Sequence, residues 1–209
     1  MNIVIVGSGN VGSALGKGWR KAGHSVTFAA RDPDGARAAE LKKEGFGIAA
    51  LASAAKNADV VVLAMPWNGA KPTMEALAVG GALAGKIVVD ATNPLTANLE
   101  LALGFNDSAG ETVARLSGGA RVVKAFNTTG ADNMADSQYP GGKLMMPVAG
   151  DDAAAKQTVM ALASDLGFEP IDVGPLSMSR CLEPMAVAWI KLAYAQGMGR
   201  EFGFAILKR

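Results

Sequence analysis

Short apolar runs alternate along most of the chain with longer segments in which apolar side chains recur every three or four positions. The first run, Ile3–Val6, precedes a segment with Val11, Leu15 and Trp19 on one helical face. Several runs are continuous Val/Ile stretches, which is typical of strands covered by helices on both sides. The pattern therefore predicts parallel strands alternating with helices.

Seven strands and the helices between them can be placed by their residues. The strands are expected at Asn2–Val6, Ser25–Ala29, Asp59–Ala64, Lys86–Val89, Arg121–Ala125, Leu144–Ala149 and Phe168–Val173. After the first helix, further helices are expected at Asp34–Glu44, Asn68–Val79, Ser108–Ser117 and Asp152–Leu166. This order predicts an α/β fold with a Rossmann-like, doubly wound, mostly parallel sheet. Pro147 and Pro170 indicate that the last two strands lie towards the sheet edge.

The pattern changes after Gly174. Residues 176–209 read as a mostly helical tail, interrupted at Pro184 and at Gly197–Gly199. No linker or repeat sets this tail apart. We therefore expect residues 1–209 to form one dinucleotide-binding domain whose tail packs on the sheet or on a partner chain.

Composition excludes several classes of function. Lys and Arg total 20 against 19 Asp and Glu, so no net charge favours nucleic acid or acidic lipid. No apolar stretch approaches the roughly 20 residues of a membrane helix, and no secretory leader is visible. With one cysteine, Cys181, and one histidine, His24, we expect no disulfide, metal site or Ser-His-Asp triad. A cytoplasmic protein without nucleic-acid or membrane partners is expected.

The sequence GSGNVG begins where the first strand ends and leads into the first helix. Gly7 allows a tight turn, Gly9 leaves room for a pyrophosphate, and Gly12 lets the helix lie close to the sheet. Backbone N–H groups near Asn10 and Val11 would then face the anion. The alternative is a glycine-rich turn without a ligand, but the strand and helix on either side favour dinucleotide binding.

Arg31 decides which dinucleotide is expected. An NAD-specific fold has an acidic residue about twenty residues after the glycine turn, whereas this chain has Ala29-Ala30-Arg31. A guanidinium can form a fork with a 2′-phosphate, and Arg37 could assist, so NADP(H) is favoured. The alternative is a surface arginine paired with Asp32 or Asp34.

Three further segments follow strands at the edge where ligands of such sheets lie. They are Met65-Pro66-Trp67, Asp90–Pro94 and Ala125–Gly130. Trp67 either lies flat along the cofactor or caps the core. The amides and hydroxyls of the other two segments either contact nicotinamide and substrate or serve their own turns.

No side chain offers itself clearly as a proton donor. His24 lies at the opposite end of the strands, and Lys124 is the best candidate, although pairing with an acid is the simpler interpretation. Hydride transfer between a nicotinamide and a flavin-like ring needs no such group, because the cofactors carry the chemistry. The tail offers a soft aromatic surface for such a ring, with core or dimer packing as the alternative. Its residues are Met178, Met185, Trp189, Tyr194, Met198 and Phe202.

Together these segments resemble the NADP reductases that use an 8-hydroxy-5-deazaflavin coenzyme. The resemblance rests on GSGNVG, on Arg31, and on four further segments: MPWNGA at Met65–Ala70, AGDD at Ala149–Asp152, DVGPLSMSR at Asp172–Arg180 and GMG at Gly197–Gly199. It implies direct hydride transfer between NADP(H) and a deazaflavin, in a homodimer. The cytoplasmic reductase domain of membrane metalloreductases is similar and implies an ordinary flavin, FMN or FAD, as the other acceptor.

The resemblance also implies which residues touch each partner. NADP(H) would contact Ser8, Gly9, Asn10, Val11, Arg31, Trp67 and Asn93, and the acceptor ring would lie near Phe126, Asn127, Met198 and Phe202. Ala30 departs from the family, which usually has a serine there. The segments at Asp90–Pro94 and Lys124–Met134 also differ from the deazaflavin enzymes.

The sequence thus predicts an NADP(H)-dependent enzyme without a catalytic side chain of its own. Two other functions stay open. One is a reductase of a small imine or carbonyl compound, and the other is a dinucleotide sensor without chemistry.

Overall fold

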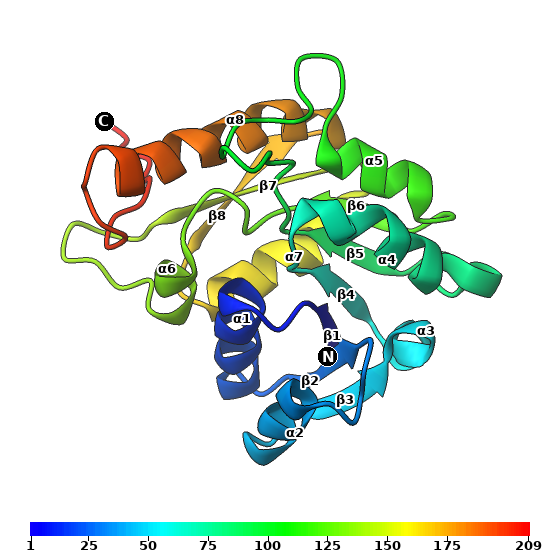
Figure 1. The fold of residues 1–209 in the computed structure, drawn as a ribbon. Helices are drawn as coiled ribbons and strands as arrows, with labels where there is room; N and C mark the ends of the chain where they lie inside the picture. Colours follow the sequence, from blue (N-terminus) through cyan, green and yellow to red (C-terminus); the bar gives the residue numbers. More distant parts are fainter.

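A computed structural model describes residues 1–209, which form one eight-stranded sheet with helices on both faces (Figure 1). The strands are β1 (Asn2–Val6), β2 (Ser25–Ala30), β3 (Gly47–Ala50), β4 (Val60–Leu63), β5 (Ile87–Asp90), β6 (Arg121–Lys124), β7 (Met145–Gly150) and β8 (Glu169–Gly174). Their order is β3-β2-β1-β4-β5-β6-β7-β8, and only the β6–β7 pair is antiparallel. This confirms the predicted Rossmann-like fold.

Eight α-helices and several shorter turns connect the strands. The helices are α1 (Asn10–Lys21), α2 (Ala36–Lys43), α3 (Leu51–Ala54), α4 (Ala70–Ala78), α5 (Ala109–Leu116), α6 (Ala131–Ala135), α7 (Ala153–Asp165) and α8 (Ser179–Ile190). The 3-10 turns are Ala55–Asn57, Trp67–Gly69, Val79–Gly81 and Leu176–Met178, and a π-helical turn covers Lys191–Ala195. None of the helices combines the length and apolar character that crossing a bilayer requires.

Alternation along β1 creates two separate cores. Ile3 and Ile5 face a large cluster with residues of α1, α2, α6 and α7, including the fully buried Trp19. Val4 and Val6 face the opposite cluster, built with α3, α4 and α5. Because side chains alternate between the faces of a strand, one apolar run can supply both cores.

Three short elements, β3, α3 and α6, were not predicted from the sequence. β3 is a four-residue edge strand that pairs only with β2, and its sequence GIAA has one β-branched residue, so its strand signal is weak. α3 has only four residues and α6 only five. β7 and β8 are the last two strands at one end of the sheet, as their prolines predict, and β8 is the edge strand itself. β7 pairs with β6 only at its last two residues, so Pro147 lies outside that ladder.

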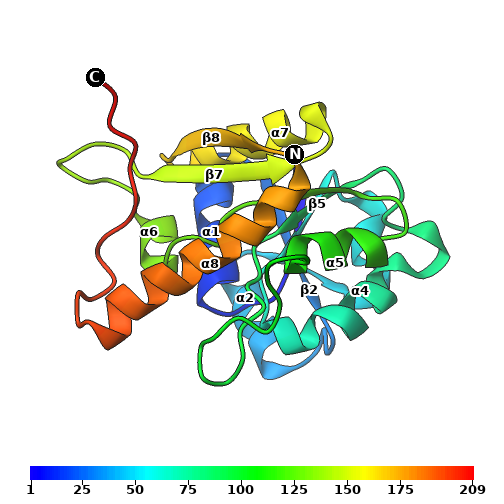
Figure 2. The ribbon, with the colours of Figure 1, turned by 90° about the horizontal axis from the view of Figure 1, so that it is seen from above.

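The tail is helical only as far as Ala195, and α8 continues through Pro184. Gly197 and Gly199 then take φ angles of 69° and 74°, which end the helix. The last residues run back beside β7, where the Met145 N–H donates to the Phe204 carbonyl at 2.8 Å. Figure 2 shows α8 crossing over the sheet between α5 and α6, with the terminal segment returning toward β7.

Candidate functional site: a dinucleotide cavity and a buried ionic cluster

A cavity of about 610 Å³ lies at the carboxyl ends of β1, β2 and β4. The strand order reverses between β1 and β4, which is where open α/β sheets bind their ligands. Of the residues predicted to bind the cofactor, six line this cavity: Gly7, Ser8, Ala30, Arg31, Met65 and Pro66. The volume falls in the range of small-molecule sites.

The glycine turn has the geometry that a pyrophosphate requires. Gly7 has a φ of 110°, and a Cβ on it would clash with the Ala64 carbonyl. A Cβ on Gly12 would likewise clash with the Gly7 carbonyl, whereas the space beside Gly9 is open. No side chain caps α1 at Gly9, and its first turn, which contains Asn10 and Val11, has no acidic residue. The uncapped helix start therefore fits an anion.

Two guanidinium groups border the cavity. Arg37 Nη2 donates to the Ser8 carbonyl at 3.0 Å and to Ser13 Oγ at 2.9 Å, which holds it against the glycine turn. Arg31 Nη2 lies 3.4 Å from Thr73 Oγ1. These two cations at the cavity fit the extra phosphate of NADP(H).

The acidic partners considered for Arg31 are engaged elsewhere. Asp34 lies 3.6 Å from Lys42, and Asp32 accepts from the Asp34 N–H at 3.2 Å. The sequence analysis missed Thr73, which lines the same cavity from α4. Its position inside a helical pattern gave no sign that it would face Arg31.

Trp67 does not line this cavity. It begins the 3-10 turn Trp67–Gly69 and packs, partly buried, against the apolar cluster that contains Met74 and Leu77. The structure thus favours the alternative in which Trp67 caps the core. Contact between Trp67 and a dinucleotide stays a prediction.

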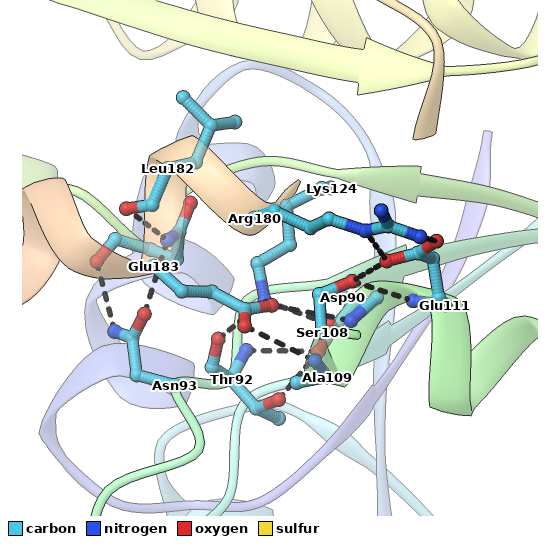
Figure 3. Close-up of polar contacts among 12 residues, drawn as sticks. Asp90, Thr92, Asn93, Ser108, Ala109, Glu111, Lys124, Arg180, Leu182 and Glu183 are labelled. Carbon is cyan, nitrogen blue, oxygen red and sulfur yellow. Dashed lines mark hydrogen bonds and ion pairs between the residues drawn. The ribbon is translucent and has the colours of Figure 1, made fainter. Parts of the chain in front are cut away.

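Beyond β5 and β6, two predicted residues, Asn93 and Asn127, form an amide pair. Figure 3 labels Asn93 of this pair. Asn127 Nδ2 donates to Asn93 Oδ1 at 3.0 Å, and Asn93 Nδ2 donates to the Asn127 carbonyl at 2.9 Å. Asn127 Nδ2 also donates to the Leu182 carbonyl of α8 at 3.1 Å. The buried Asn127 Oδ1 has no hydrogen-bond partner. The pair thus joins two strand ends to α8 and leaves one acceptor unused.

Under this pair lies a buried ionic cluster, also drawn in Figure 3. Lys124 Nζ is 2.8 Å from Asp90 Oδ2, 2.8 Å from Glu183 Oε1 and 2.7 Å from the Thr92 carbonyl. The expected pairing of Lys124 with an acid is confirmed, with two acids in place of one. Burial raises the pKa of the Glu183 carboxyl, an effect that the Lys124 charge opposes.

The sequence analysis missed Glu183 because it is distant in the chain from Lys124. The one available signal was an acidic residue on the face of α8 that also carries the buried Leu182, Ala186 and Trp189. No group of three or more His, Cys, Asp or Glu side chains is arranged to hold a metal ion.

The residues predicted near an acceptor ring do not all meet. Phe126 is 1% exposed and packs edge-on against Trp19, with ring centroids 5.5 Å apart. Phe202 instead stacks on Trp189 at 5.2 Å, and its carbonyl accepts from Trp189 Nε1 at 3.0 Å. Met198 is 57% exposed. The ring of Phe126 therefore belongs to the core, and the acceptor roles of Asn127, Met198 and Phe202 stay predictions.

Comparisons with known proteins agree with this geometry. Residues 2–94 match the family described as NADP oxidoreductase, coenzyme F420-dependent. A crystal structure of an Arthrobacter sp. FB24 protein described as an F420-dependent NADP-reductase is 34% identical, with a TM-score of 0.87 and full coverage of both chains. An imine reductase of Streptomyces aurantiacus shares the fold at 19% identity and a TM-score of 0.66, with 94% of this chain and 65% of that one covered.

Two metalloreductases are also similar over part of their length. Metalloreductase STEAP3 of Rattus norvegicus is 31% identical over 86% of this chain, and metalloreductase STEAP2 of Homo sapiens is 31% identical over 48%. The matched region covers 35% of STEAP3 and 19% of STEAP2. The chain therefore spans about a third of the length of STEAP3, the relative that it matches over more residues.

Proposed function

Because the chain belongs to the family of coenzyme F420-dependent NADP oxidoreductases, we propose that it transfers a hydride directly between NADP(H) and a deazaflavin or flavin ring. The observation that carries the cofactor half is the pair of guanidiniums, Arg31 and Arg37, beside the cavity and the uncapped start of α1. When bound, the dinucleotide would donate or accept the hydride at its nicotinamide. The protein's residues bind it, orient it and exclude water.

The acceptor half rests on different support. A similar protein covered over its full length is described as an F420-dependent NADP-reductase, which favours the deazaflavin. An ordinary flavin is the second acceptor that we propose, because the reductase domain of metalloreductases, which this chain resembles, implies one. Lys124 also supports a reaction without a protein acid, because its ammonium is buried and bound on all sides. For the same reason a small imine or carbonyl substrate is disfavoured.

We further propose a homodimer that uses the tail. Four of its apolar residues are exposed: Tyr194, Met198, Ile206 and Leu207. Where exposed apolar groups form one contiguous patch, they mark an association surface. Light scattering on the purified protein checks the mass, and a monomer at all concentrations would remove the dimer from the proposal.

The function is tested by mixing the pure protein with NADPH and, in turn, the deazaflavin coenzyme, FMN, FAD and a small cyclic imine. We expect NADPH to be oxidised with at least one ring acceptor and not with the imine. Turnover with the imine alone would establish the alternative reductase. Binding of NADPH without turnover of any acceptor would identify a sensor.

A further inference from the structure

We propose that Lys124 is a positioning residue that holds the Asn93–Asn127 amide pair where the nicotinamide end of the dinucleotide binds. The inference rests on the proposed function for the identity of the ligand. Its structural basis lies in the amide pair and in the buried cluster of Asp90, Lys124 and Glu183, which Figure 3 shows with Asn93.

The Lys124 ammonium is engaged within the protein. Nζ donates to Asp90 Oδ2 at 2.8 Å and to the Thr92 carbonyl at 2.7 Å, and it forms an ion pair with Glu183 Oε1 at 2.8 Å. Lys124 is 0% exposed. A cation that is paired and shielded in this way fixes its neighbours and does not exchange protons with a substrate.

The buried cluster connects elements that are distant in the sequence. Asp90 ends β5, Lys124 ends β6 and Glu183 belongs to α8. The Glu183 carboxylate also accepts from the backbone N–H groups of Ala109 at 3.1 Å and Gly110 at 3.2 Å, at the start of α5. Lys124 therefore fixes two strand ends relative to two helices.

Asn93 and Asn127 are both linked to this cluster through neighbouring residues. Asn93 follows Thr92, whose carbonyl and hydroxyl are held by Lys124 and Asp90. Asn127 lies three residues after Lys124 and donates to the carbonyl of Leu182, the neighbour of Glu183. A shift of the cluster would therefore move both halves of the amide pair.

The amide pair has an unused acceptor for a ligand N–H group. Asn127 Oδ1 is buried without a partner, and a buried acceptor is stabilised when an N–H reaches it. The carboxamide of a nicotinamide has such N–H groups. The pair lies beyond the carboxyl ends of β5 and β6. Ligands of open α/β sheets bind at this end of the strands.

The test separates the two ends of the dinucleotide. The dissociation constants of NADPH and of 2′-phospho-ADP-ribose, which lacks the nicotinamide, are measured by calorimetry for wild type, Lys124→Met and Glu183→Gln. We expect both variants to bind the fragment within about twofold of wild type and to bind NADPH roughly tenfold more weakly, with kcat lowered on the order of ten- to a hundredfold. Glu183→Gln serves if Lys124→Met does not fold.

Arg180→Met is the matched control. Arg180 pairs with Glu111 at 2.6 Å and joins the same two helices, α8 and α5, without touching the amide pair. We expect both dissociation constants to stay at the wild-type values in this variant. A loss equal to that of the cluster variants would show that general loosening of α8 is the cause and would overturn the inference.

Other results of the same measurements would also overturn the inference or the proposed function. The inference fails if the cluster variants weaken both ligands equally or neither, or if wild type binds NADPH no more tightly than the fragment. Loss of a limb of the kcat–pH profile in Lys124→Met would identify Lys124 as a proton donor, against the proposal. Wild-type protein that binds NADPH but reduces no ring overturns the proposed function alone, because the binding comparison needs no turnover.

Discussion

The guanidinium of Arg31 meets the hydroxyl of Thr73, with Nη2 3.4 Å from Oγ1, and both residues line the dinucleotide cavity. Arg31 follows β2, whereas Thr73 lies in the first turns of α4 and is 3% exposed. The preceding residue, Ala30, has no hydroxyl of its own. Helix α4 thus supplies a hydroxyl next to the arginine where its own strand does not.

This contact predicts the behaviour of Thr73 variants. Thr73→Val keeps the shape of the side chain but removes the oxygen, so we expect NADPH to bind about fivefold more weakly, as for loss of roughly 1 kcal/mol. NADH should be unaffected, Thr73→Ser should resemble wild type, and Ala30→Ser should restore part of the loss in Thr73→Val. Calorimetric titrations check this. If Thr73→Val weakens NADH as much as NADPH, the hydroxyl serves the adenosine and not Arg31.

Arg31→Ala is expected to separate the two dinucleotides further. Hydrogen bonds to charged groups contribute about 1.5–3 kcal/mol, so NADPH affinity should fall roughly tenfold to a hundredfold. NADH, which has no 2′-phosphate, should lose little. Arg37→Ala should act in the same direction, because Arg37 is held beside Ser8 at the same cavity. Equal losses for both dinucleotides would show that Arg31 does not read the phosphate.

The ionic cluster predicts a large stability effect for Lys124→Met. The change leaves the buried carboxylates of Asp90 and Glu183 without their cation, which costs about 3–5 kcal/mol. Urea unfolding measures it. Lys17→Met is the control, because Lys17 pairs with Glu44 at 2.9 Å on the surface, and its midpoint should hardly move. Similar midpoints for the two variants would refute the buried pairing.

The pH dependence of stability should carry the signature of Glu111. Hydrogen bonds from Arg180 hold the pKa of the Glu111 carboxyl below its usual 4.5. The folded state therefore binds this proton more weakly than the unfolded state, and the stability it gives is present above pH 4.5 and lost as pH falls through the folded pKa. The difference in unfolding free energy between wild type and Glu111→Gln should shrink from about pH 5 to pH 3. A difference independent of pH would contradict this.

Local chemistry explains why the cofactor half could be predicted from the sequence. The positive φ of Gly7 and the contact of Gly12 with the turn are demands of the backbone, which the residue types reveal directly. Arg31 lines the same cavity as the glycine turn, because two neighbouring strands carry the turn and the arginine to one edge of the sheet.

The acceptor half of the site depends on contacts between segments that are distant in the sequence. Glu183 reaches Lys124 only after α8 has packed across the sheet, and no local pattern indicates that pairing. Phe126 has a φ of 63° and turns its ring into the core against Trp19. Its position just after a strand did not indicate this orientation. The short edge strand β3 was lost because its residues have little strand preference.

The central claim is direct hydride transfer from NADPH to a planar ring, and a label tests it most directly. NADPH carrying deuterium at the transferable position of the nicotinamide is mixed with the protein and the deazaflavin coenzyme in ordinary water, and the reduced coenzyme is analysed by mass spectrometry. We predict that the deuterium appears on the deazaflavin. Oxidation of NADPH with the label lost to water, or no oxidation with the deazaflavin or with FMN and FAD, would contradict the account.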